Sequence, residues 1–404
     1  MRFVLVNFRW LLASFLLFFM SSFGQTMFIS IFAGEIQKEF NLSNGAWGGL
    51  YMAGTLSSAI AMLWLGGLTD IFKVRLLGSL TLGLLSLSCL AMYFLDYLFI
   101  LPFVIFALRL TGQGMTTHIA SVSIGRWFVA TRGRAISISH LGYSLGEATL
   151  PVLFVLIISF YGWRYSWLLS AIILLAAIPL LIALLSRERS PKSVIEEQYS
   201  TGLNNRHWTR GEAICHPLFW FLFPSLLGPA AFSTAFFFLH VHYAEIKSWS
   251  HLQVVSLFPI FTVSSIIAML VSGVIIDRFN TSKLMYLCLI PSTIGFLVLS
   301  FSGTLFLASI GISMIGVTSG IQSTLSSAFW AEFYGTKNLG SIKALATSTM
   351  VLGSALGPGI TGYAIDLGFN FTTQMPWISA YYVFATILAL FGIKKALKNH
   401  LVSL

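Results

Sequence analysis

Gly66-Gly67-Leu68-Thr69-Asp70 closes one apolar run of the sequence, and Gly273-Val274-Ile275-Ile276-Asp277 closes another 207 residues later. The same offset superposes Gly146 on Gly353, so the similarity extends beyond a single motif. A long internal repeat in an apolar chain is typical of membrane transporters built from two similar halves. The repeat therefore predicts one architecture that occurs twice in the chain.

The composition of the 404-residue chain indicates a membrane protein. Hydrophobic residues make up 57% of the chain and charged residues 9%, with a mean hydropathy of +0.86. Irregular backbone facing lipid would leave peptide groups without hydrogen bonds, and a helix needs about 20 apolar residues to cross the bilayer. The long apolar runs therefore predict an all-α integral membrane protein.

The apolar runs predict twelve transmembrane helices in two pseudo-symmetric halves of six. The predicted spans are residues 10–33, 45–67, 76–95, 98–123, 135–160, 166–186, 216–243, 252–275, 284–302, 305–329, 341–364 and 376–393. The long polar segment at 187–212 then separates an N-terminal half, 1–186, from a C-terminal half, 213–404. Its mixed charges are typical of a solvated cytoplasmic linker, and a regulatory or partner-binding role for it stays open.

The basic residues predict the orientation of the chain in the bilayer. With both termini in the cytoplasm, eighteen of the 23 Lys and Arg fall on the cytoplasmic side, and only Lys38, Arg164 and Lys247 fall outside. We therefore expect a multi-pass protein of the cell inner membrane. The net charge of +10 is dispersed over successive loops rather than gathered in one stripe, which argues against a nucleic-acid partner.

The loop after the second predicted span carries a family signature. Residues 66–75 resemble the Gly-x-x-x-Asp-Arg-x-Gly-Arg-Arg motif of the major facilitator superfamily, with Ile71 and Lys73 where Arg and Gly are expected, and the copy at 273–283 keeps the acidic and the first basic position. The resemblance covers essentially the full chain. It implies a gating role at helix ends for Asp70, Arg75, Asp277 and Arg278.

Further motifs are similar to a bacterial branch of that superfamily, related to monocarboxylate transporters and oxalate:formate antiporters. They are Arg109-Leu110-Thr111-Gly112-Gln113-Gly114, Arg126-Trp127-Phe128, Arg132-Gly133-Arg134-Ala135, Gly142, Gly146, Glu147, Pro151, Tyr334-Gly335-Thr336-Lys337, Gly340, Gly353 and Gly357-Pro358. Those relatives often carry an arginine in the eighth span, whereas residues 253–276 here have no basic residue. A substrate carboxylate would need another partner.

Arg109 is the candidate for that partner. It lies about twelve residues into its span, which is about 18 Å deep at the rise of a helix. An arginine there costs at least ~2.5 kcal/mol on insertion scales, so it should face the interior of the bundle. It either binds a substrate anion or takes part in proton coupling, or it only holds helices together through carbonyls or a carboxylate.

Glu147 is the carboxylate that lies deep inside a predicted span, at the depth of Arg109 on the neighbouring helix. The two residues form a candidate ion pair, in which an incoming anion or a proton on Glu147 would change the partner of Arg109. His140 shares a helix face with Glu147 and is either a proton relay or a packed residue. The same two alternatives apply to His118, which lies on the face of the fourth span opposite to Arg109. His240 is expected at the outer rim.

The remaining candidates concern packing and substrate contact. Four glycines are expected to allow close helix approach, and two prolines to bend matched helices; these are Gly142, Gly146, Gly353, Gly357, Pro151 and Pro358. Three amides are candidate substrate contacts or interhelical hydrogen-bond donors, namely Gln25, Gln113 and Gln322.

The sequence shows no phosphate-cradling loop, no metal-ligand spacing and no Ser-His-Asp arrangement, so we predict no enzyme, no cofactor and no metal site. We expect a secondary active transporter, a monomer that moves a small organic anion such as a monocarboxylate by alternating access, with a proton or in exchange for a counter-anion. One alternative is a proton-coupled exporter of hydrophobic or cationic drugs, for which the 36 Phe and Glu147 argue. Another is a non-transporting membrane sensor, which flux across a vesicle membrane would distinguish from a carrier.

Overall fold

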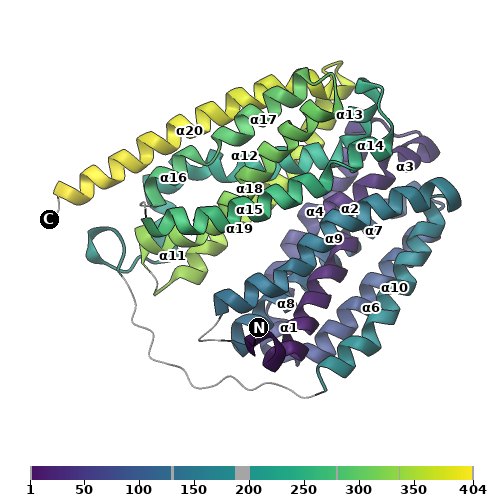
Figure 1. Cartoon of the computed structure of the whole chain (residues 1–404), viewed down its shortest axis with the longest axis horizontal. Coiled ribbons are helices and arrows are strands. Elements are labelled where there is room, and N and C mark those ends of the chain that lie inside the picture. Colours follow the sequence, from purple (N-terminus) through teal and green to yellow (C-terminus); the bar gives the residue numbers. More distant parts are fainter. Residues whose placement is uncertain (1, 129–131, 187–200, 279–280, 336, 403–404) are drawn as a thin grey trace. The chain divides into compact units, whose positions relative to one another are not determined.

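The computed structural model describes residues 2–128, 132–186, 201–278, 281–335 and 337–402. Within these ranges the side chains of Asp70, Asp277 and Arg278 lie outside the description. Every regular element that is described is helical, and the chain forms two compact units, Met1–Glu196 and Glu197–Leu404 (Figure 1). Each unit is a bundle of long helices, which confirms the all-α membrane fold predicted from the apolar runs.

The N-terminal unit begins with a discontinuous first span. Its elements in chain order are α1 (Arg2–Met20), η1 (Ser21–Gly24), α2 (Thr26–Ile29), η2 (Ser30–Phe32), α3 (Ala33–Phe40), α4 (Asn44–Leu65), α5 (Leu68–Ile71), α6 (Val74–Tyr93), η3 (Leu98–Ile100), α7 (Leu101–Leu108), η4 (Arg109–Thr116), α8 (Thr117–Trp127), α9 (Arg132–Tyr161) and α10 (Trp163–Leu184). Helices α9 and α10 are joined by Gly162 alone, whose positive φ of 81° favours glycine.

The C-terminal unit contains longer uninterrupted helices. Its elements are η6 (Leu203–Asn205), α11 (Arg210–Cys215), α12 (Pro217–Phe238), α13 (His240–Lys247), α14 (His251–Val255), α15 (Phe258–Arg278), α16 (Thr281–Leu287), α17 (Ile290–Phe301), α18 (Leu305–Tyr334), α19 (Leu339–Asp366) and α20 (Phe371–Val402).

The two units pair their helices in the same way. In the N-terminal unit α1 packs on α9, α4 on α7 and η4, and α6 on α10. In the C-terminal unit α12 packs on α19, α15 on α18, and α17 on α20. Each pair in the second set follows its counterpart by about the offset of the sequence repeat, so the repeat reflects a common packing scheme.

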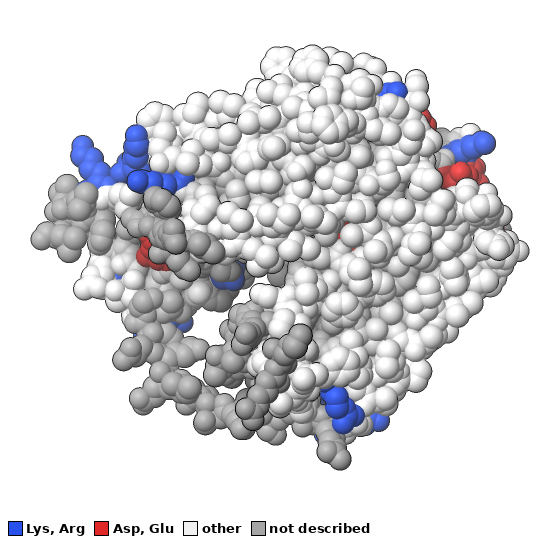
Figure 2. All heavy atoms as spheres, in the orientation of Figure 1, with Lys and Arg blue, Asp and Glu red and all other residues white. Residues whose placement is uncertain are grey.

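Ten segments of the described chain are long and apolar enough to cross a membrane. One of them, Ala135–Leu184, holds both α9 and α10 and so accounts for two predicted spans. The eleventh predicted span is the helix α19, which is not among the ten segments because its Gly, Ser and Thr residues lower its mean hydropathy. Large apolar side chains such as Trp64, Phe160 and Trp377 are exposed. The charged side chains in Figure 2 gather toward helix ends, as expected for a lipid-facing surface.

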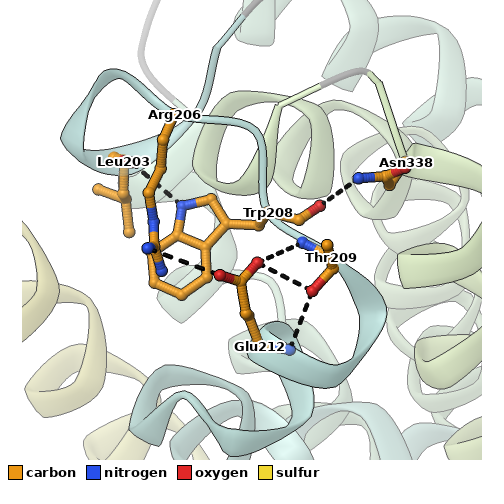
Figure 3. Close-up of polar contacts among 6 residues, drawn as sticks. All are labelled: Leu203, Arg206, Trp208, Thr209, Glu212 and Asn338. Atoms are coloured by element: carbon orange, nitrogen blue, oxygen red, sulfur yellow. Dashed lines mark hydrogen bonds and ion pairs between the residues drawn. The ribbon is translucent and has the colours of Figure 1, made fainter.

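Part of the predicted linker is ordered against the C-terminal unit (Figure 3). Trp208 is buried, and its indole Nε1 donates to the carbonyl of Leu203 at 3.1 Å. Its backbone N–H donates to the Tyr334 carbonyl at 3.2 Å, and Asn338 Nδ2 donates to the Trp208 carbonyl at 2.9 Å. These bonds attach the segment to the end of α18 and the loop after it.

The start of α11 is capped from the same segment. The backbone N–H of Thr209 donates to Glu212 Oε2 at 2.7 Å and its hydroxyl at 2.8 Å, which lowers the pKa of the Glu212 carboxyl. Arg206 lies 3.6 Å from the same carboxylate and acts on this pKa in the same direction, and its guanidinium lies 4.0 Å from the Trp208 ring centroid. The boundaries of the linker stay a prediction.

Candidate substrate site

The first span is broken at Gln25, where the backbone is extended with φ −84° and ψ 154°. The break lies beside η4, at a point where two backbones touch. A Cβ on Gly24 would lie 2.3 Å from the carbonyl oxygen of Leu108, and a Cβ on Gly112 would lie 2.5 Å from the Cα of Gly24. Glycine at both positions is therefore required for this close approach.

The facing element η4, Arg109–Thr116, is a π-helix. Such wide turns are rare and occur frequently at functional sites. The hydroxyl of Thr111 donates to the Ala107 carbonyl at 2.6 Å, and that of Thr116 donates to the Thr111 carbonyl at 2.7 Å. The π-helix places Arg109 at its first position, directly opposite the break in the first span.

Arg109 is buried, with 1% of its surface exposed. Its Nη1 donates to the Gly24 carbonyl at 3.1 Å and to Thr26 Oγ1 at 3.3 Å. The Thr26 hydroxyl is in turn 2.5 Å from the hydroxyl of Tyr51, and the Arg109 guanidinium lies 5.3 Å from the Tyr51 ring centroid. The broken first span and α4 thus fix one side of the guanidinium.

The other side of the guanidinium is buried and has no hydrogen-bond partner among the described residues. The nitrogens on this side are Nε and Nη2 of Arg109. These two nitrogens form one edge of the planar group, with parallel N–H bonds that match the two oxygens of a carboxylate. A buried donor pair left without an acceptor costs about 1–3 kcal/mol per group. Nε and Nη2 are therefore the two donors of Arg109 that have no acceptor among the described residues.

Glu147 and Tyr143 lie one turn apart on α9. The Tyr143 hydroxyl donates to Glu147 Oε1 at 3.3 Å. Among the described residues Arg109 makes no hydrogen bond to Glu147, since Nη1 donates to the first span and Nε and Nη2 have no hydrogen-bond partner; an ion pair between the two stays a prediction. The exposed ring of His140 lies 5.1 Å from that of Tyr143.

A small pocket lies between the first span and α9. Its lining has three polar members, Ser22, Gln25 and Glu147, and four others, Met27, Phe28, Gly146 and Pro151. The Ser22 hydroxyl is buried without a hydrogen-bond partner among the described residues. The pocket has room for about one water molecule, which needs two to four polar partners. It can therefore hold a water against Glu147.

The remaining candidate site residues lie in both units. Gln113 lies half-buried in η4, near Arg109 in the chain. Gln322 lies on α18 of the C-terminal unit, where its Nε2 donates to the Ser225 carbonyl at 3.1 Å. This bond joins α18 to α12 and matches the interhelical alternative. Arg75 is exposed in the first turn of α6.

The candidate glycines lie at helix crossings. A Cβ on Gly142 would lie 2.2 Å from the Phe15 carbonyl oxygen, and one on Gly146 would lie 2.1 Å from Ser22 Oγ. In the C-terminal unit a Cβ on Gly353 would lie 2.5 Å, and one on Gly357 2.1 Å, from a carbonyl oxygen of α12. Pro151 and Pro358 lie inside α9 and α19, respectively.

Two histidines lie in environments that the sequence did not indicate. His240 is fully buried, with Nδ1 2.7 Å from the Phe237 carbonyl and Nε2 2.8 Å from His251 Nε2. His118 Nε2 lies 3.1 Å from the carbonyl of Gly66, inside the signature loop. His240 begins α13, and its contact with His251 packs it against α14; its position at the outer end of the span stays a prediction.

Sequence reasoning missed Thr26, Tyr51 and Tyr143. A threonine or tyrosine in an apolar helix is common, and nothing in its spacing distinguishes one that contacts Arg109. Thr26 follows the candidate Gln25, which is the only signal in the sequence. These three hydroxyls complete the polar cluster around the break.

Comparison with known proteins agrees with this architecture. The family model of the Major Facilitator Superfamily matches residues 14–358 and 256–398. A bacterial homolog of the human lysosomal transporter Spinster, in an inward-facing and unoccupied conformation, is 16% identical, with a TM-score of 0.74 over 96% of this chain and 97% of that chain. A mutant of the nucleoside transporter NupG is 13% identical, with a TM-score of 0.72 over 96% of this chain and 99% of that chain. No curated protein sequence matched the chain.

The chain belongs to the Major Facilitator Superfamily. Members of this family are multi-pass membrane transporters of small molecules and not enzymes. The low identity to the solved structures limits that likeness to the fold, so the substrate has to be argued from the site itself.

Proposed function

We propose that this protein is a secondary active transporter of small organic anions, with Arg109 as the residue that binds the substrate carboxylate. The observation that supports the proposal most strongly is that Nε and Nη2 of the guanidinium are buried without a hydrogen-bond partner among the described residues. A lone buried cation with two parallel donors is poorly satisfied by water or by a single carbonyl, and well satisfied by a carboxylate. Gln25 and Gln113 lie close to Arg109 in the fold or in the chain and are the proposed neutral contacts.

Coupling to protons is assigned to Glu147, with His140 as a second candidate. Glu147 borders the pocket that can hold a water, and such a water is the proposed partner for proton exchange with the carboxylate. A proton moving with an anion makes the transported unit neutral. Exchange against a counter-anion is the alternative, in which Arg109 is released by one anion only as the next one arrives.

The remaining proposals follow the family. The signature loops, with Asp70, Arg75, Asp277 and Arg278, are proposed as gates between two six-helix halves joined by residues 187–212. The motifs shared with monocarboxylate transporters and oxalate:formate antiporters support a monocarboxylate as substrate. We place the monomeric protein in the cell inner membrane with both termini in the cytoplasm, because that orientation leaves only Lys38, Arg164 and Lys247 outside.

Uptake of radiolabelled acetate and lactate into proteoliposomes tests this proposal. Arg109→Lys keeps the charge but loses the parallel donors, so anion affinity should fall by about 10- to 150-fold for the loss of one charge-assisted hydrogen bond worth 1.5–3 kcal/mol. The matched control is Arg9→Lys, because Arg9 donates to the Ala183 carbonyl and the Ser186 hydroxyl at the end of α10, away from the proposed site. An Arg109→Lys variant that loses folded yield and uptake to the same degree would assign the arginine a structural role.

A further inference from the structure

We propose that the hydrogen bond between His240 and His251 is an acid-sensitive latch that holds the α13–α14 hairpin closed. His240 begins α13 and His251 begins α14, and His240 is fully buried. The two Nε2 atoms lie 2.8 Å apart and the ring centroids 4.9 Å apart. The latch lies in the C-terminal unit and is independent of the proposed substrate site, which lies in the N-terminal unit.

The carbonyl of Phe237 determines which nitrogen of His240 carries a hydrogen. This carbonyl oxygen lies 2.7 Å from Nδ1 and can only accept, so Nδ1 is the donor. In the neutral ring Nε2 of His240 is then an acceptor, and the hydrogen between the two rings belongs to Nε2 of His251. Both nitrogens of the buried imidazole are therefore satisfied as long as one hydrogen lies between the rings.

The bond survives one added proton and is broken by two. When one ring is charged, it can donate to the neutral ring. When both rings are charged, an N–H group and a positive charge on each side face one another at the position where the Nε2 atoms are now 2.8 Å apart. Like charges this close repel, and neither nitrogen can accept. The closed hairpin therefore requires at least one neutral imidazole.

The other titratable groups of α13 have partners away from the pair. His242 Nδ1 lies 3.9 Å from Oε2 of Glu245. The Lys247 ammonium and the Tyr243 hydroxyl donate to backbone carbonyls at the end of α17, at 2.9 Å and 3.0 Å. Among the described residues, no carboxylate lies within ion-pair distance of either imidazole of the latch.

The elements around the pair add no nearby charge. α13 packs on α12, α14 and α20, and the ring of Phe258 on α15 lies 5.3 Å from that of His240. The sequences of α12 and α14 contain no Asp, Glu, Lys or Arg. The titratable residues of the other two helices come later along them: Tyr381, Tyr382 and the lysines from Lys394 onward on α20, and Asp277 and Arg278 on α15. Two positive charges on the pair would therefore repel without a carboxylate beside them.

The N-terminal unit contains an equivalent hairpin without a titratable bond. By the offset of the sequence repeat α3 corresponds to α13, and their C-caps, Asn41 and Ser248, both have a positive φ, of 51° and 55°. The same offset aligns His251 with Asn44, whose Oδ1 accepts a hydrogen bond from Gln37 Nε2 at 3.2 Å. Side-chain amides do not titrate. One hairpin is thus closed by an amide pair and the other by an imidazole pair.

Hydrogen exchange of the detergent-purified full-length protein measures the latch directly. Exchange would be followed by mass spectrometry from about pH 8 to about pH 4, on both sides of the ordinary histidine pKa of about 6.5. The protection factors of residues 240–255 should fall in acid by about 2- to 10-fold, as expected for the loss of one hydrogen bond. Those of residues 33–48, the amide-closed hairpin, are the internal reference.

Two substitutions of His251 separate the hydrogen bond from its titration. In His251→Gln the amide can donate to neutral His240 and accept from charged His240, so the fall in protection should be absent. In His251→Leu the partner is lost, and protection should be low already at about pH 8. Any change caused by carboxylates elsewhere in the chain would persist in His251→Gln, which makes this variant the matched control.

The account fails if the unmodified protein and His251→Gln lose protection in acid to the same degree. It also fails if the unmodified hairpin keeps its protection throughout, or if His251→Leu is protected like the unmodified protein at about pH 8. If the His251 variants do not fold, His240→Gln tests the same bond, because its amide can accept from His251 at every pH. An undiminished acid transition in His240→Gln would overturn the latch.

Discussion

Gly142→Ala should destabilise the N-terminal unit, although alanine is the better helix former. At this crossing of α9 with α1 the added Cβ would lie 2.2 Å from the Phe15 carbonyl oxygen and 3.0 Å from its carbonyl carbon. Both atoms belong to the backbone of a long helix and cannot rotate away. Gly49→Ala in α4 is the matched control, because nothing lies within 4 Å of its added Cβ.

The expected magnitudes follow from these contacts. Carbon and oxygen atoms in van der Waals contact lie about 3.5 Å apart, so α1 and α9 must separate by about 1 Å. Overpacking of this kind costs about 1–3 kcal/mol, and the exchange of Gly for Ala in a helix returns about 1 kcal/mol. We expect a net loss of about 1 kcal/mol for Gly142→Ala, the middle of a range of about 0–2 kcal/mol, or a fall in Tm of about 2–4 °C for a unit of this size. Gly49→Ala should instead gain about 1 kcal/mol, or about 2–4 °C.

Thermal melting of the two variants in one detergent at one scan rate measures the difference. Loss of the monodisperse peak in size-exclusion chromatography after heating provides a second readout. Equal Tm values for Gly142→Ala and Gly49→Ala would refute the reasoning, because they would mean that the α1–α9 crossing has room for a methyl group.

Three further substitutions test other parts of the structure. Trp208→Ala should cost about 3 kcal/mol of docking free energy, the lower end for a buried tryptophan, and should make residues 203–215 sensitive to protease; unchanged cleavage would contradict the docked segment. The lowered pKa of Glu212 means that its bonds stabilise the docked segment above the unfolded pKa of about 4.3 and are lost as the pH falls through the folded value. Trp208 fluorescence should therefore stay constant from neutral pH down to about pH 5 and change in more acidic solution, and in Glu212→Gln this acid transition should be absent. Gln322→Ala removes the bond to the Ser225 carbonyl and should lower the free energy of unfolding by about 1–3 kcal/mol without changing anion affinity; a large loss of affinity at normal stability would return Gln322 to the substrate site.

The helical architecture was predictable because an apolar run of spanning length has few other stable structures in lipid. The two similar halves were predictable from the sequence repeat, and both halves pack corresponding helices in the same way. The break at Gln25 could not be predicted, since the run at 10–33 has no charged residue and no proline, and the break depends on the close approach of Gly24 to Gly112 in a distant segment. The docking of the linker could not be predicted for a similar reason, because Trp208 forms hydrogen bonds with Tyr334 and Asn338, which lie more than 100 residues away in the sequence.

The candidate site was predictable in its charges but not in its geometry. The depth of Arg109 and Glu147 in their predicted spans marked both as candidates, because a charged side chain inside the bilayer is costly and is usually paired or functional. The hydrogen bond from Tyr143 to Glu147, and those from Arg109 to Gly24 and Thr26, depend on side-chain directions that sequence spacing does not specify. The two nitrogens of Arg109 without a partner, Nε and Nη2, can be recognised only once the hydrogen bonds of Nη1 are known from the structure.

Thermal stabilisation of the detergent-purified protein tests the anion site most directly. A panel of small carboxylates, sugars, amino acids and lipophilic cations would be compared on the unmodified chain and on Arg109→Ala. A ligand present at a hundredfold excess over its Kd stabilises the folded state by about 2.7 kcal/mol. We predict that carboxylates raise the Tm of the unmodified protein and that Arg109→Ala abolishes this shift. Stabilisation by lipophilic cations, with no response to carboxylates, would contradict the anion site and make Glu147 the binding charge of a cation exporter.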